Sequence, residues 1–155
     1  MESKDKAIVA ACTDCWDKEF IKGLKNSQNC SGFVKAVAAK LGVALPQTGN
    51  ADAIVDFIKG WSQLKSGADA MREAASGKFV LVGLKASQHK PVATNGHVAI
   101  IVSGKLYHSL YPPVWCGSIG SAQSKGDKSV GEVWNRVDRD KVVYYAHATS
   151  PPKEA

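Results

Sequence analysis

The sequence lacks a long apolar run. No stretch approaches the ~20 consecutive apolar residues that a helix needs to cross a bilayer. The first residues, "MESKDKAIVAACTDC", also lack a basic segment followed by an apolar core, which is the pattern of a secretory signal peptide. We therefore expect a chain that is made in the cytoplasm without a signal peptide and is not inserted into membranes.

Clustered basic residues are missing as well. The chain carries a net charge of +6, from 20 basic and 14 acidic residues, which favours anionic partners in general. Its lysines are scattered singly, and no recognised nucleic-acid motif occurs among them. We therefore expect no nucleic-acid partner, while an acidic lipid or a cell-wall polymer remains compatible with the charge.

A second Cys-x-x-Cys pair, which would complete a four-ligand zinc site with "CTDC", is also absent. A thioredoxin-like redox motif should follow a strand, and no strand pattern precedes Cys12 and Cys15. Residues three apart share one face of a helix, so we expect both thiols to pack in the core. Whether they form a disulfide is open, and we expect no metal and no cofactor.

The first half of the chain has helical periodicity. A chain of 155 residues can bury roughly 70% of its unfolded surface, enough for one domain over residues 1–155. The apolar spacing after Cys30 predicts a helix that ends at Gly42. Two more helices are predicted, from about Ala51 to Leu64 and from Ser66 to Gly77, with Asn50 and Ser66 as caps.

The second half is rich in β-forming residues. We expect strands over 78–84, 97–102, 105–111 and 141–147, with a hairpin turn at Ser103 and Gly104. The Gly- and Ser-rich segment 117–131 is predicted to be a surface loop, and residues from about 150 to 155 a flexible tail. There is no internal repeat, so the predicted class is α+β, with N-terminal helices packed on an antiparallel sheet.

Cys30 stands immediately before the first of these helices, in "NCSGFV". A thiol at a helix N-terminus lies near unpaired backbone N–H groups, which stabilise the thiolate and predict a pKa below the usual ~8.5. The same N–H groups can hold an oxyanion, and the small Ser31 and Gly32 let a carbonyl approach the sulfur. From this motif alone, a nucleophile and a structural cysteine are equally open.

A nucleophilic cysteine needs a base, and the chain has four histidines. His97 begins an apolar strand, where its side chain can project from a rigid sheet edge, so it is the candidate general base. His89 lies in a polar loop and is expected to be solvated, His108 lies in a predicted strand, and His147 lies near the end of the last one. A single strand histidine is often structural, but Cys, helix and then His on a strand is the papain-like order.

Several separated motifs occur in an order that resembles a known family. They are "WDK" at 16–18, "NCSGFV", "GHVAIIVSG", "YPPVWCGSIGSA" and "KSVGEVWNRVDRDKVVYY". The cysteine and histidine motifs resemble the NlpC/P60 superfamily of cell-wall cysteine peptidases. The whole set, across nearly the entire chain, resembles the first family of type VI secretion amidase effectors.

This resemblance implies a papain-like NlpC/P60 fold and an antibacterial toxin. The implied activity is hydrolysis of the γ-D-glutamyl-meso-diaminopimelate bond in peptidoglycan peptide stems. Type VI secretion machinery would inject the protein into a recipient cell's periplasm, which makes a signal peptide unnecessary. A cognate immunity protein would protect the producing cell, and we expect the effector to be a monomer.

The resemblance also assigns roles by position. Cys30 matches the nucleophile and His97 the base, with the oxyanion near Ser31 and Gly32. Cys116 in "YPPVWCGS" aligns with the third position, where the superfamily has a polar group that orients the histidine. A thiol is a poor orienting group, and a buried strand cysteine is the alternative.

The sequence also departs from the superfamily beside the nucleophile. Asn29 replaces the superfamily's usual Asp before the nucleophile, which removes a negative charge next to the thiol. The segment Asp138, Arg139 and Asp140 is predicted to be a solvated turn. A non-catalytic wall-binding or toxin-carrier domain on the same scaffold remains an alternative function, whereas related acyltransferases typically place His before Cys.

Overall fold

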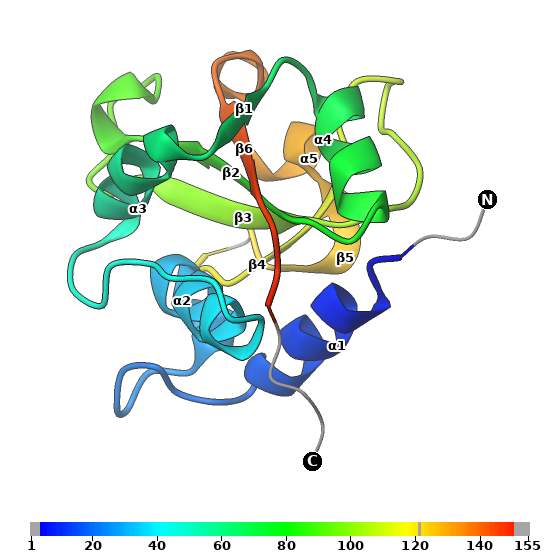
Figure 1. The fold of residues 1–155 in the computed structure, drawn as a ribbon. Helices are drawn as coiled ribbons and strands as arrows, with labels where there is room; N and C mark the ends of the chain where they lie inside the picture. Colours follow the sequence, from blue (N-terminus) through cyan, green and yellow to red (C-terminus); the bar gives the residue numbers. More distant parts are fainter. Residues whose placement is uncertain (1–3, 121, 151–155) are drawn as a thin grey trace.

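A six-stranded antiparallel sheet lies between two groups of helices in the computed structural model, which describes residues 4–120 and 122–150 (Figure 1). The helices are α1 (Lys6–Cys15), α2 (Cys30–Lys40), α3 (Ala51–Phe57), α4 (Gly67–Ala75) and α5 (Val130–Val133). The strands are β1 (Ser62–Leu64), β2 (Phe79–Leu84), β3 (His97–Ile101), β4 (Pro113–Cys116), β5 (Ser124–Ser129) and β6 (Val143–His147). The predicted α+β class, with early helices packed on an antiparallel sheet, is confirmed.

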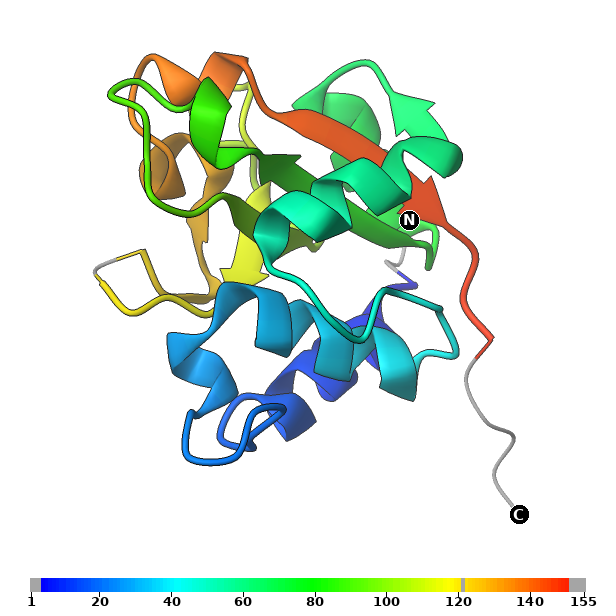
Figure 2. The ribbon, with the colours of Figure 1, turned by 90° about the vertical axis from the view of Figure 1, so that its left-hand side faces the viewer.

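The strand order is β1-β6-β2-β3-β4-β5, which places β2 and β3 inside the sheet. Alternate residues of a strand point to opposite faces, and both faces of these strands are buried. Phe79, Leu81 and Val98 pack toward α1, α2 and α3, whereas Val80 and Val82 pack in the second core with α4. Figure 2 shows α1 and α2 (blue) together on one side of the sheet. This two-sided burial explains why β2 and β3 are continuous apolar runs.

The predicted helix after Asn50 is shorter than expected. Asn50 accepts a hydrogen bond from the backbone of Asp52, but α3 ends at Phe57 and a single 3₁₀ turn (Ile58–Gly60) follows. The expectation of helix up to Leu64 is wrong, because Ser62–Leu64 pairs with β6 as an edge strand. The helix predicted after Ser66 is confirmed as α4.

Two predictions for the second half are also wrong. Residues 105–111 form no strand but a turn closed by a bridge between Tyr107 and Tyr111, in which His108 and Ser109 have φ of 52° and 59°. The chain therefore returns from β3 to β4 through a loop rather than through a tight hairpin at Ser103 and Gly104. The segment 117–131 is not all loop, since it contains the edge strand β5 and the start of α5.

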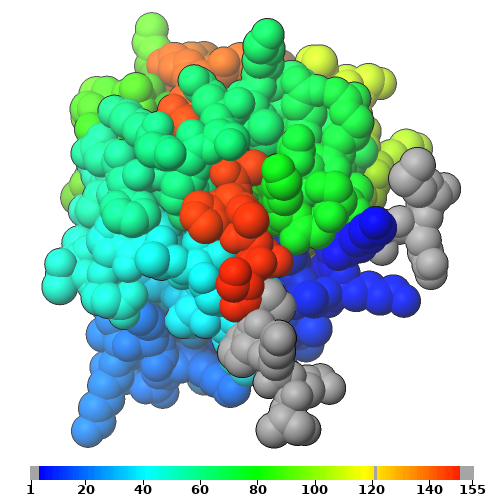
Figure 3. Space-filling view, viewed as in Figure 1, coloured from blue at the N-terminus to red at the C-terminus, as the bar shows by residue number. Residues whose placement is uncertain are grey.

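The N-terminal cysteines and the described end of the chain both lie on the side of the sheet where α1 and α2 pack. Cys12 and Cys15 are buried and free, as expected for core thiols. Ser150 donates its backbone N–H to the carbonyl of Leu41 at 2.8 Å, so the end of the described chain (red) lies against the residues after α2 (Figure 3). The rest of the predicted tail, 151–155, lies outside the described residues. No helix in the described part is both long and apolar enough to span a membrane.

The loop after β4 packs directly on the turn before α2. Ser118 donates its backbone N–H to Ser27 at 3.0 Å. A Cβ at Gly117 would overlap the carbonyl oxygen of Asn26 and lie 3.1 Å from the backbone N and O of Asn29. Glycine is therefore the residue that lets this loop approach the chain just before Cys30.

We expect Gly117→Ala to lower the free energy of unfolding by about 2 kcal/mol, because backbone atoms on the turn before α2 must move to admit the methyl group. Gly120→Ala is the matched control in the same loop, since a Cβ there meets no atom within 4 Å; it should stay within about 0.5 kcal/mol of wild type. Urea denaturation measures both. Equal stabilities of the two variants would contradict this account of the contact.

Candidate active site

The start of α2 is defined by a side-chain cap. Asn29 has extended backbone angles, and its Oδ1 accepts hydrogen bonds from the backbone N–H of Gly32 at 3.1 Å and the hydroxyl of Ser31 at 3.2 Å. A Cβ at Gly32 would overlap the Asn29 side chain. The sequence "NCSG" thus fixes the first turn of α2, with Cys30 as its first residue.

The Cys30 thiol lies where α2 meets β3. Backbone N–H groups of Val98, Ser31 and Cys30 itself point to its sulfur and favour the thiolate. Burial opposes them and is the larger effect, so the pKa of Cys30 is raised above its ordinary value. The lowered pKa predicted from the helix start is therefore wrong, because the apolar surroundings outweigh the helix N–H groups.

His97 is held at the first position of β3. Gly96 before it is buried, and a Cβ there would overlap the Asp52 carboxylate, which accepts the backbone N–H of Ala86 at 2.9 Å. The His97 ring packs edge-on against Trp134, with ring centroids 5.0 Å apart. Its Nε2 is buried and has no hydrogen-bond partner among the described residues.

Burial also determines the charge of His97. Desolvation, followed by the nearby charge of His89, lowers the pKa of His97 from 6.5 to about 4. The ring is therefore neutral near neutral pH. A neutral imidazole can accept a proton from a neutral thiol, which is the combination found here.

Cys116 reaches the same region from the end of β4. A charge on Cys30 raises the pKa of Cys116, in addition to the larger effect of burial, so the two sulfurs lie within electrostatic range of each other. The Cys116 thiol donates to the carbonyl of Ala122 at 3.1 Å. The thiol therefore donates to a carbonyl and not to His97 Nε2, which has no partner among residues 4–120 and 122–150.

The structure therefore brings three predicted residues together, at the ends of three elements. Cys30 begins α2, His97 begins β3 next to the Val98 N–H that faces the sulfur, and Cys116 ends β4. Of the two residues predicted near an oxyanion, Ser31 directs its N–H to the sulfur, whereas the Gly32 N–H is occupied by Asn29. No set of three or more His, Cys, Asp or Glu side chains in the described residues is arranged to hold a metal.

Of the other three histidines, His147 lies at the end of the last strand as predicted, whereas His89 and His108 differ from their predicted environments. His108 lies in the turn 105–111, and His147 contacts Trp61 at the far end of β6, with ring centroids 4.9 Å apart. His89 is not solvated: only 14% of its side chain is exposed, and its Nδ1 lies 3.2 Å from the carboxylate of Asp138. Asp138 itself is 2% exposed, so the prediction of a solvated turn is wrong for this residue.

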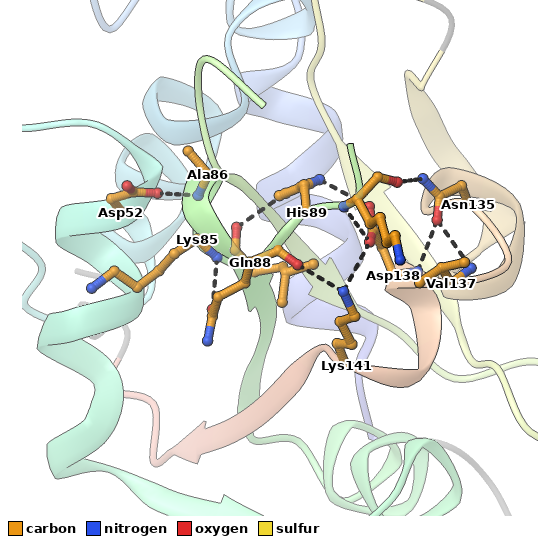
Figure 4. Close-up of polar contacts among 11 residues, drawn as sticks. Asp52, Lys85, Ala86, Gln88, His89, Asn135, Val137, Asp138 and Lys141 are labelled. Atoms are coloured by element: carbon orange, nitrogen blue, oxygen red, sulfur yellow. Dashed lines mark hydrogen bonds and ion pairs between the residues drawn. The ribbon is translucent and has the colours of Figure 1, made fainter. Parts of the chain in front are cut away.

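Figure 4 shows the polar contacts around His89 and Asp138. Sequence reasoning missed this cluster because both residues lie in short polar segments, 49 positions apart, that have no periodic pattern. The "WNRVDRD" motif contained Asp138 and Trp134, but nothing in it indicated that the carboxylate would be buried.

Comparison with known proteins gives a clear relative. The chain is 51% identical over 151 residues to the peptidoglycan amidase Tse1 of Pseudomonas aeruginosa strain PAO1. The matched region covers 96% of this chain and 94% of that protein. No protein-family model matches the chain.

The low pKa of His97 predicts a pH dependence of stability. In the unfolded chain the ring protonates near its ordinary value of 6.5, and in the folded protein only near 4. Between these values the unfolded state binds more protons, so the free energy of unfolding should fall as the pH falls, by up to about 3 kcal/mol. Urea denaturation at several pH values should show a smaller fall for His97→Gln than for His147→Gln, and equal falls would contradict the prediction.

The raised pKa of Cys30 predicts slow alkylation at neutral pH. Because iodoacetamide reacts with the thiolate, Cys30 in the folded protein should react more slowly than the same residue in urea, and its rate should keep rising above pH ~8.5. Mass spectrometry of the Cys30 peptide measures the rate at this residue. A faster reaction in the folded protein at pH 7 would show that the helix N–H groups dominate after all.

Proposed function

We propose that this chain, which belongs to the family of the peptidoglycan amidase Tse1 and of the type VI secretion amidase effectors that its motifs resemble, hydrolyses peptidoglycan with Cys30 as nucleophile. One observation carries the mechanism: the Cys30 sulfur faces the backbone N–H of Val98, directly after His97. A helix start and a strand start thus supply a thiol and a neutral base at one place. Residues 1–155 would act as a single catalytic domain.

The proposed bond is the amide between D-glutamate and meso-diaminopimelate in the peptide stem. His97 accepts the thiol proton while the sulfur attacks the γ-glutamyl carbonyl carbon, which gives a tetrahedral oxyanion. When the C–N bond breaks, the amine leaves with the proton from His97, and an acyl thioester remains on Cys30. Water, activated by His97, then attacks the thioester, and release of the carboxylic acid restores the thiol.

The electrostatics support general-base attack by a thiol that is neutral before reaction. The pKa of Cys30 is raised by burial, and the pKa of His97 is lowered by burial, so both groups are neutral near pH 7. An imidazole with a depressed pKa is a weak base but, once protonated, a strong acid. His97 is therefore well suited to protonate the departing amine.

The oxyanion donors would be the backbone N–H groups of Cys30 and Ser31, which already point toward the sulfur. Gly32 would contribute differently from Ser31, because its N–H is committed to Asn29. Its missing side chain permits the cap that aims the other two donors. Cys116 would occupy the third position and contribute by filling the space beside the two reacting residues.

Membership of this family supports a biological setting. Type VI machinery would deliver the effector to the periplasm of a recipient cell, where it would act as a monomer on peptide stems. A cognate immunity protein would protect the producing cell. The alternative is a non-catalytic wall-binding or carrier domain, which the net positive charge would serve equally well.

The two functions differ in the products from purified muropeptides. We expect wild-type protein to release new diaminopimelate amines, and Cys30→Ala or His97→Gln to lose at least about 10³-fold of this activity while remaining folded. Mass spectrometry of the digested muropeptides identifies the bond that is cut.

Two controls match these variants. Cys15→Ala removes a buried thiol outside the site, and His147→Gln removes a distant ring, so both should keep the activity. Undiminished cleavage by Cys30→Ala would exclude Cys30 as nucleophile. Binding to sacculi with no new amine, even for wild type, would favour the carrier domain.

A further inference from the structure

A buried contact between His89 and Asp138 lies beside the candidate base. The Asp138 carboxylate is 2% exposed and lies 3.2 Å from Nδ1 of His89. It also accepts the backbone N–H of Lys90 at 2.8 Å, and the ammonium group of Lys141 lies 3.8 Å away at the surface. A carboxylate this deeply buried needs such partners, and His89 is the one that is itself largely buried.

This pair connects two segments that are distant in the sequence. Lys90 donates to Asp138 through its N–H, and its carbonyl accepts from Asn135 Nδ2 at 3.0 Å. Lys141 donates to the carbonyl of Gln88 at 3.1 Å. The loop between β2 and β3 is therefore fastened to the segment 134–141 by three hydrogen bonds and the His89–Asp138 contact, as Figure 4 shows.

The second nitrogen of His89 points to the backbone of β2. Its Nε2 lies 3.4 Å from the carbonyl oxygen of Leu84. Both ring nitrogens of His89 thus face hydrogen-bond acceptors, a carboxylate oxygen and a carbonyl oxygen. Leu84 is the register partner of His97 in the β2–β3 ladder, so His89 contacts the backbone directly opposite the candidate base.

The segment 134–141 also contacts that base. Trp134 is 4% exposed, and its ring packs on the ring of His97. The next residue, Asn135, accepts the backbone N–H of Asp138 at 2.8 Å, which closes a short turn between Trp134 and the His89–Asp138 contact. His97 is therefore contacted by two groups, Trp134 and the Leu84 backbone, that His89 and Asp138 hold in place.

We infer that His89 and Asp138 form a positioning pair that holds the His97 ring at the angle required for proton transfer with Cys30. The inference rests on the proposed function, in which His97 is the base. The pair stands in for the orienting side chain of a catalytic triad, because Nε2 of His97 has no hydrogen-bond partner in the described part of the chain. It acts through packing and strand register rather than through a direct bond.

The pair also affects the charge of His97. Asp138 from the segment 134–141 faces His89, with Lys141 on the other side of that carboxylate, and His97 from β3 lies within electrostatic range. After burial, the His89 charge is the second cause of the low pKa of His97. Loss of that charge should therefore raise the pKa of His97 and move the acid limb of the activity profile to higher pH.

The variants His89→Gln and Asp138→Asn test the inference. We expect each to lower kcat about tenfold, less than the ~100-fold that a 1 Å misplacement can cost, with KM changed by less than about twofold. The matched controls are His147→Gln and Asp17→Asn, which remove the same groups from exposed positions. His89 is partly exposed, so His89→Gln keeps the test available if Asp138→Asn does not fold.

A second readout does not depend on substrate. In an NMR titration of the histidine rings, the pKa of His97 should rise in His89→Gln and stay unchanged in His147→Gln. An unchanged His97 titration together with unchanged kcat in His89→Gln would overturn the inference. If wild type is inactive, or Cys30→Ala is active, the proposed function fails instead, and the NMR result still decides whether His89 acts on His97.

Discussion

The packing of the α2 N-terminus against the first residues of β3 is the contact on which the site depends. α2 and β3 belong to different halves of the chain, and neither carries both a thiol and an imidazole. Glycines allow the close packing around this contact: Gly117 brings the loop after β4 onto the turn before α2, Gly96 lies against the Asp52 carboxylate, and Gly32 leaves room for the Asn29 cap. The two-sided core around β2 and β3 makes this arrangement rigid.

That close approach has an electrostatic cost. Enclosing a thiol and an imidazole in apolar surroundings favours their neutral forms, and at Cys30 this effect exceeds the attraction of three backbone N–H groups. A reactive thiolate is thus not stored in the resting site. The same enclosure strengthens the interaction between a dipole and any charge that forms during the reaction. The N–H groups of Cys30 and Ser31 therefore stabilise the oxyanion more strongly as its charge develops.

The sequence predicted the elements whose local pattern and packing agree. β2, β3 and β6 are apolar runs because they lie inside the sheet, and α2 has both a cap and a periodic apolar face. Edge elements escaped prediction. β5 reads "SKGDKS" because it borders solvent, and Ser62–Leu64 becomes a strand only because β6 offers it hydrogen bonds. The aromatic segment 105–111 has β-forming residues, but its pairing among the described residues is the isolated bridge between Tyr107 and Tyr111.

In the site, too, features with a local sequence signal were predicted and features that depend on tertiary packing were not. Cys30 and His97 carry local signals, a helix start and a strand start, and these signals made both of them candidates from the sequence alone. The burial of Cys30 depends on tertiary packing, so the direction of its pKa shift could not be read from the helix start. The polar segments around His89 and Asp138 resemble solvated loops until the fold brings them together.

The buried pair is difficult to explain by stability alone. Desolvation of the two polar side chains offsets much of the benefit of their contact, and two apolar side chains of similar volume commonly hold a loop as firmly. Apolar groups, however, could neither bond to the Leu84 carbonyl nor place a positive charge near His97. The directional bonds and the charge both act on the base, so the position of the pair is better explained by the chemistry of His97 than by the attachment of a surface loop.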